Sequence, residues 1–345
     1  PQHPINDALF TRYFTVRYQL YKLTNYMEHT PELEETDVYL QSMDFAHAWM
    51  LGLIPTEEIY RELMGRVNSP TRIKDITSAL DERNHSLFHS LTQKVVNRIL
   101  EIELQRGDSE TQVTRLAEEL HRVYGAETLI RILQAFGKDT FIRDSYNWRN
   151  TKRGVLSSLL HACYPSPDDD SDTLKSLASQ ADISHIRLVE AAMFAPQWLE
   201  LTEKATGWKG LESAAYYFHA HTSECFDDKK KAIIARYTPI AIEDLQEGAF
   251  DIDWFKEAYK AIGKERFEVV YNAAKYISLS NTHTRARKFA DAVNGKTKAA
   301  DAKKEIIAKR NKDLLMSYGL IPLGRKADKE LLERYQFLQQ FLKES

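Results

Sequence analysis

Two histidine–cysteine pairs have the clearest potential for metal chemistry in this chain. His161 and Cys163 lie two residues apart, and His221 and Cys225 are separated by one helical turn. Zinc takes four ligands of these types, or three and a water, so the two pairs together would complete one site. The alternative is that His221 belongs to an aromatic helix, marked by the run 216–219, that packs in the core.

Other catalytic patterns are incomplete. Glu82 with His85 and Glu118 with His121 have the spacing of di-iron carboxylate helices, but the two further glutamate-bearing helices cannot be nominated. Residues 290–297 fit a permissive phosphate-loop pattern, yet a helix and not a strand is expected before them. The chain has no Gly-x-Ser-x-Gly elbow. We therefore expect no cofactor, and the sequence favours a non-enzymatic role without excluding an enzyme.

The basic segment, residues 285–312, is the main candidate for a binding surface. Residues 264–330 carry 16 Lys and Arg against 8 Asp and Glu, whereas residues 1–263 carry 29 against 40. Such clusters are typical of phosphate contacts. A surface that meets the acidic part of the same chain is the simpler explanation of the pattern, and a solvated helix face would also account for the lysines. The candidate contacts are Arg285, Arg287, Lys288, Lys303, Lys304 and Lys309.

Composition narrows the class of protein. The 345 residues are 43% hydrophobic and 28% charged, as in globular proteins, and the net charge of −3 does not itself indicate nucleic acid. Two cysteines imply no disulfide framework, which favours a reducing, cytoplasmic location. The longest apolar stretch, residues 46–54, is far shorter than a membrane span of about 20 residues. Because the chain starts at Pro1 and stops at Ser345 within a helical pattern, we expect a piece of a longer protein.

Helical periodicity runs almost from end to end, which predicts an all-α fold. Glycine and proline are scarce, at 13 and 10 residues, and the only strand-like segment is 237–242. In the first helix, the predicted buried stripe is Leu9, Tyr13, Val16, Leu20, Leu23 and Met27. The predicted helices span 5–28, 38–53, 56–64, 86–105, 111–124, 126–136, 153–163, 173–180, 184–204, 209–225, 229–236, 252–262, 265–278, 283–293, 299–317 and 328–343.

A proline- and aspartate-rich segment, residues 164–172, interrupts the helices. It is the best candidate for a linker or long loop. We therefore predict an N-terminal helical lobe over 1–163 and a C-terminal helical-hairpin lobe over 173–345.

An internal similarity indicates repeated helical hairpins. Residues 198–212 align without gaps to residues 254–268, with shared Trp, Lys, Ala, Gly and Glu positions, and a fainter copy surrounds Gly137. In each copy a glycine follows the first helix, where it can end the helix with positive φ. Repeated hairpins that stack on their neighbours form an α-solenoid. The unequal spacing indicates a degenerate, HEAT-like array, and chance similarity between two amphipathic hairpins remains an alternative.

Three segments, residues 283–295, 308–323 and 333–345, resemble the MolR-like family. The resemblance covers roughly residues 185–345. It implies membership of a group of large bacterial proteins of uncharacterised function, some carrying a WGR domain, with a proposed role in molybdate regulation. It assigns no catalytic residue.

Together these features predict a cytoplasmic bacterial interaction module that presents a concave helical face to a protein partner. The alternative is a regulator that contacts nucleic acid through the basic segment. The sequence does not identify the partner or the oligomeric state.

Overall fold

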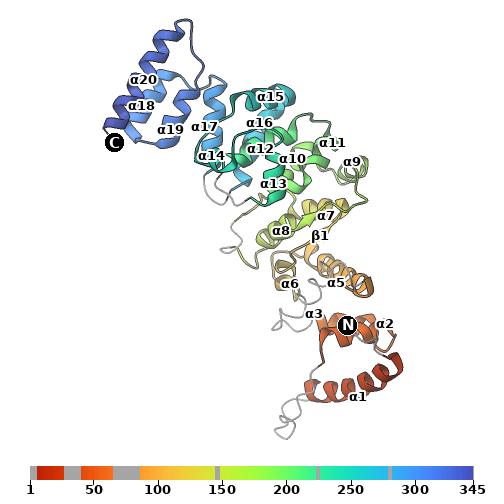
Figure 1. Ribbon diagram of the computed structural model, residues 1–345. Coiled ribbons are helices and arrows are strands. Elements are labelled where there is room, and N and C mark those ends of the chain that lie inside the picture. The colour runs from red at the N-terminus through yellow and green to blue at the C-terminus, as the bar shows by residue number, and fades with distance from the viewer. Residues whose placement is uncertain are drawn as a thin grey trace. The chain divides into compact units, whose positions relative to one another are not determined.

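The protein is described by a computed structural model, which covers residues 6–26, 40–64, 86–143, 148–222, 226–278 and 282–344. The all-α prediction is confirmed, because these residues form packed helices almost throughout (Figure 1). Within this part of the chain the only strands are β1 (Val123–Tyr124) and β2 (Cys163–Tyr164), which pair with each other.

The chain divides into two compact units. The first comprises residues 1–123 and 146–162, and the second comprises 124–145 and 163–345. In the second unit, the Asp169 carboxylate accepts the backbone N–H groups of Ser166 and Ala126, at 2.7 and 2.9 Å. Asp170 caps the helix that begins at the next residue. Side chains of the acidic segment therefore order the local backbone, while the predicted division at 164–172 stays a prediction.

The helices of the first unit are α1 (Asp7–Tyr26), α2 (Ser42–Met50), α3 (Thr56–Met64), α5 (Ser86–Leu104), α6 (Thr114–Glu118) and α8 (Lys152–His161). The helices of the second unit are α7 (Ala126–Phe136), α9 (Ser171–Gln180), α10 (His185–Phe194), η2 (Pro196–Trp198, a 3₁₀ turn), α11 (Leu199–Thr206), α12 (Leu211–Ala220), α13 (Asp228–Ile234), α14 (Ile242–Glu247), α15 (Ile252–Ile262), α16 (Lys264–Ala273), η3 (Ala274–Tyr276, a 3₁₀ turn), α17 (His283–Val293), α18 (Ala299–Lys309), α19 (Lys312–Leu320) and α20 (Ala327–Lys343).

Helix α1 buries a different stripe from the predicted one. Its buried side chains are Phe10, Phe14, Tyr18 and Tyr21, and the Phe14 ring meets the edge of Phe45 in α2. The prediction was wrong at the four described positions of the expected stripe, which remain 43–68% exposed. Helix α1 carries two apolar stripes, and the aromatic one is buried because α2 packs on it through Phe45.

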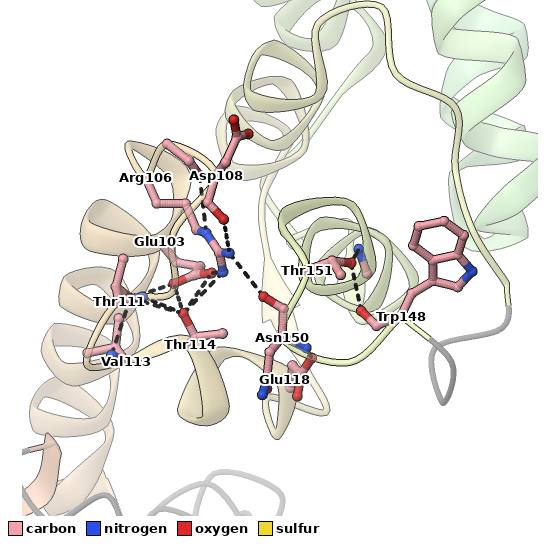
Figure 2. A network of polar contacts seen from close by, with 12 residues as sticks. Glu103, Arg106, Asp108, Thr111, Val113, Thr114, Glu118, Trp148, Asn150 and Thr151 are labelled. Carbon is pink, nitrogen blue, oxygen red and sulfur yellow. Dashed lines mark hydrogen bonds and ion pairs between the residues drawn. The ribbon is translucent and has the colours of Figure 1, made fainter.

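A buried ion pair holds the polar interior of the first unit (Figure 2). Arg106 Nη1 lies 2.6 Å from Glu103 Oε1, and both side chains are inaccessible to solvent. The hydroxyls of Thr111 and Thr114 donate to Glu103, at 2.7 and 3.0 Å. Arg106 Nη2 also donates to the Asn150 carbonyl at 3.0 Å, just before α8. A buried pair contributes to stability only when such additional bonds complete it.

Two helical hairpins confirm the repeat expected in the second unit. The first is α11 and α12, separated by Gly207 at φ +66°, and the second is α15 and α16, separated by Gly263 at φ +80°. The equivalent Trp198 and Trp254 are both buried. Each indole N–H donates to a preceding element: Trp198 to the Cys163 carbonyl at 2.7 Å, and Trp254 to the Ser213 hydroxyl at 2.9 Å.

The faint third copy is only half a hairpin. Gly137 ends α7 at φ +55°, but the residues that follow are not helical. Phe141 is instead buried against Phe194 and Tyr276, with the Arg187 guanidinium 4.1 Å from its ring centroid. An aromatic contact therefore replaces the second helix.

Several predicted helices are shorter than expected. The one over 184–204 divides at Pro196, which cannot donate the hydrogen bond that would continue α10. The one over 299–317 divides at Arg310, at φ +45°, and Asn311 caps α19. The one over 111–124 reduces to α6, and the strand-like 237–242 leads into α14 without forming a strand.

Two glycines of the first hairpin offer a matched test of its packing. A Cβ at Gly207 would meet nothing within 4 Å, whereas one at Gly210 (φ +87°) would lie 2.7 Å from Ala261 Cβ in α15. We expect Gly207→Ala to lower the free energy of unfolding by about 1 kcal/mol, through backbone strain alone. In Gly210→Ala a steric clash with α15 adds to the same backbone strain, so we expect the free energy of unfolding to fall by about 3 kcal/mol. Equal losses in urea titrations would contradict the close approach of α15.

The two charges of the buried ion pair, Glu103 and Arg106, are expected to be energetically coupled. Arg106→Met leaves Glu103 buried and unpaired, so we expect it to lower the free energy of unfolding by about 3–5 kcal/mol. Combining it with Glu103→Leu is expected to cost at least about 1 kcal/mol less than the sum of the two single variants. Additive losses in the double-mutant cycle would show that the two charges do not depend on each other.

Candidate binding surface

The predicted zinc ligands do not form a site in the described part of the chain. His161 is exposed at the end of α8, and Cys163 is buried in β2, where burial raises the pKa of its thiol. His221 ends α12, and Cys225 lies outside the described residues. Where side chains are described, no three His, Cys, Asp or Glu residues are grouped to hold a metal ion.

The di-iron and phosphate-loop patterns have structural roles where they are described. The Glu118 carboxylate accepts the Asn150 backbone N–H at 2.6 Å, while Glu82 and His85 lie outside the described residues. The segment 290–297 is the end of α17, closed by Gly295 at φ +70°. A helix C-terminus presents carbonyl groups, not the N–H groups that surround a phosphate.

Helix α12 places two histidines inside an aromatic cluster. His221 Nδ1 donates to the Tyr217 carbonyl at 2.8 Å, and its ring lies among Tyr217, Phe250 and Phe289. Burial lowers the pKa of His221 to about 4. Burial, with Lys230 and Arg143 adding to it, also lowers the pKa of His219. Both rings are therefore neutral at neutral pH and belong to the core. This agrees with the alternative to a zinc site, in which an aromatic helix packs in the core.

Two arginines of the basic segment bond to their own chain. Arg285 Nε lies 2.8 Å from the Asp313 carboxylate in α19, and its Nη1 donates to the Gln246 carbonyl. Arg287 donates to the backbone carbonyls of Tyr271 and Asn272, both at 2.9 Å, and its guanidinium lies over the Tyr271 ring. These bonds hold α17 against α14, α16 and α19.

The lysines of the segment are more accessible. Lys309 pairs with Glu305 one turn earlier at 2.5 Å, and Lys303 lies over the Phe337 ring. Lys304 is exposed and Lys288 half-exposed, and neither forms an ion pair with a described residue. The six predicted contacts thus turn toward several different neighbours, and two lysines keep charges that a ligand can reach.

Helix α20 is buried on one side only, next to α18 and α19 (Figure 1). Phe337 joins the cluster around Ile306, Leu314 and Tyr318. Arg334 donates to the Ile321 carbonyl at 2.5 Å, which fixes the helix on the preceding loop. The opposite side, here called the α20 face, carries Leu331, Leu332, Tyr335 and Leu342, which are 56–62% exposed.

The whole chain, residues 1–345, matches the family of unknown function DUF5724. The chain belongs to the DUF5724 family. No curated protein and no solved structure matches it. Among the described residues of this DUF5724 chain, no helix has the length and apolarity needed to span a bilayer.

The buried histidines make the stability of the DUF5724 chain depend on pH. Because the folded-state pKa of His221 lies below its unfolded value of about 6.5, its contribution is complete above pH 6.5 and is lost as pH falls toward 4. The loss is roughly 3 kcal/mol. His221→Asn keeps a donor for the Tyr217 carbonyl, and we expect it to reduce the slope of unfolding free energy between pH 4 and 6.5.

The exposed His121 provides the control for that measurement. Urea titrations of His121→Asn should follow the pH slope of the unmodified chain. If His221→Asn follows it too, His221 is not buried and neutral in the folded protein.

Proposed function

We propose that this chain is a non-enzymatic helical array that binds a protein partner through the α20 face. The observation that carries the proposal is a single short surface with four large apolar side chains more than half exposed. Exposed apolar surface of this kind is typical of protein interaction sites, and tyrosine is enriched among the residues that dominate binding energy.

The anchoring of α20 also supports the proposal. Arg334, Phe337 and Phe341 hold one side of the helix to the rest of the unit, with the Arg310 guanidinium over the Phe341 ring. A helix fixed in this way presents its other side without first having to order, which lowers the cost of binding.

The setting of this module is a further part of the proposal. A cytoplasmic, bacterial regulatory protein of the MolR-like type would agree with the two-cysteine composition and with the resemblance in residues 185–345.

The alternative proposal is a nucleic-acid contact through the basic segment. Because Arg285 and Arg287 bond to their own chain, such a contact would depend on Lys288, Lys298 and Lys304. Charge reversal of the two arginines would disturb the packing of α17 and would not test binding.

Photo-crosslinking in the native cells distinguishes the two proposals. We place benzoylphenylalanine at Tyr335, on the α20 face, or at the exposed Gln336 beside it. We expect a crosslinked protein adduct when benzoylphenylalanine is at position 335. The yield of this adduct should be at least tenfold lower when benzoylphenylalanine is at position 336. Leu331→Ser with Leu342→Ser should abolish the adduct, and Gln336→Ser with Gln340→Ser, two exposed positions on a different stripe of α20, should not.

The other outcomes oppose the protein proposal. An adduct that nuclease digests, and that Lys298→Glu with Lys304→Glu removes, would favour the nucleic-acid alternative. No adduct at position 335, or one that is insensitive to the leucine substitutions, would contradict binding at the α20 face.

A further inference from the structure

A second exposed apolar surface of the protein lies on helix α1 and is independent of the α20 face. Leu9, Tyr13, Val16 and Leu20, here called the α1 ridge, are 68, 43, 59 and 45% exposed. Their spacing of four, three and four residues is that of the a and d positions of a coiled coil. At 3.6 residues per turn, the four positions lie within an arc of about 60° and extend for about 17 Å.

The ridge stands on a helix that is already fixed from behind. The Phe10 ring stacks on His47 with centroids 4.1 Å apart, and Tyr18 and Tyr21 enclose Phe45. His47 Nε2 also lies 3.3 Å from the Asp7 carboxylate. The aromatic side of α1 therefore packs on α2, and the exposure of the ridge is not that of an unattached helix.

Positive charge lies on both flanks of the ridge. On a helical projection Arg12 falls beside one edge and Arg17 beside the other, in the g and e positions of the same heptad pattern. Arg12 is exposed, and the Arg17 guanidinium lies 5.3 Å from the Tyr13 ring centroid. Asp7 is the only carboxylate of α1, and it already faces His47.

From this geometry we infer that the α1 ridge binds a single amphipathic helix of another protein, with acidic residues flanking its apolar positions. A narrow ridge about three turns long suits one helix, whereas a helix that lies in a membrane surface presents a broad apolar side. Flanking charges of one sign select a partner with the opposite sign. They also disfavour a second copy of α1, which would bring arginine against arginine.

The test uses two synthetic helical peptides of 21 residues with leucine at every a and d position. One carries glutamate at all e and g positions and the other lysine, so that neither peptide pairs with itself. Fluorescence anisotropy with the full chain should show at least tenfold tighter binding of the glutamate peptide. Leu9→Ser with Val16→Ser should weaken that binding more than tenfold.

Charge exchange separates recognition from loss of folding. Arg12→Glu, alone or with Arg17→Glu, should reverse the preference so that the lysine peptide binds more tightly, a gain that an unfolded chain cannot produce. Lys22→Glu, on the same helix but away from the ridge, makes an equal change of charge and should alter the preference less than threefold. Circular dichroism confirms that each variant keeps its helices.

Several results would overturn the inference. Equal affinity for the two peptides, no binding of either, or a preference that Arg12→Glu leaves unchanged would each do so. If sedimentation shows that the full chain is a dimer and that Leu9→Ser with Val16→Ser abolishes the dimer, a second copy of the chain occupies the ridge. Ridge-dependent binding to vesicles of phosphatidylserine and phosphatidylcholine would make it a lipid surface. These results leave the α20 proposal untouched, because the crosslinking concerns a different helix.

Discussion

Short helices that cannot persist alone are the constraint on which this fold depends. Helices α10, α12 and α16 have ten residues each, and an isolated helix of that length is marginal in water. Each one therefore requires apolar contact with its neighbours. Helix α12 shows the extreme case, since it is buried from Ala214 to Ala220 between α11, α15, α16 and α17. The buried Trp198 ties the first hairpin to β2, and the buried Trp254 ties the second hairpin to α12 of the first, as in stacked repeats.

The parts of the fold that local sequence signals specify were predictable. Gly207 and Gly263 mark the hairpins because a glycine after a helix commonly ends it by adopting positive φ. Arg310 shows where prediction from local sequence fails. A non-glycine residue at positive φ is uncommon, so the sequence did not predict that the helix over 299–317 breaks there. The local signal that could have indicated the break is Asn311, an ordinary N-cap residue for α19. The buried stripe of α1 was also wrong, because the helix has two apolar stripes and only its partner, through Phe45, selects between them.

The binding surfaces were less predictable than the fold. Composition correctly located a dense group of basic residues, but it could not show that Arg285 and Arg287 bond to Gln246, Tyr271 and Asn272, which are distant in sequence. Periodicity predicted a helix over 328–343, yet burial of Phe337 and exposure of Tyr335 depend on where α18 and α19 lie. The two exposed apolar surfaces emerge only when the packed side of each helix is known.

Residue-level oxidative footprinting tests most directly whether a protein covers the α20 face. Hydroxyl radicals label accessible side chains, and the comparison is between the purified chain and the same chain in its native cells. Oxidation of Leu332 and Tyr335 should fall several-fold in cells, while Ile186, which is 50% exposed on α10, should be labelled equally in both. Undiminished oxidation of Leu332 and Tyr335 in cells would contradict a bound partner at this face.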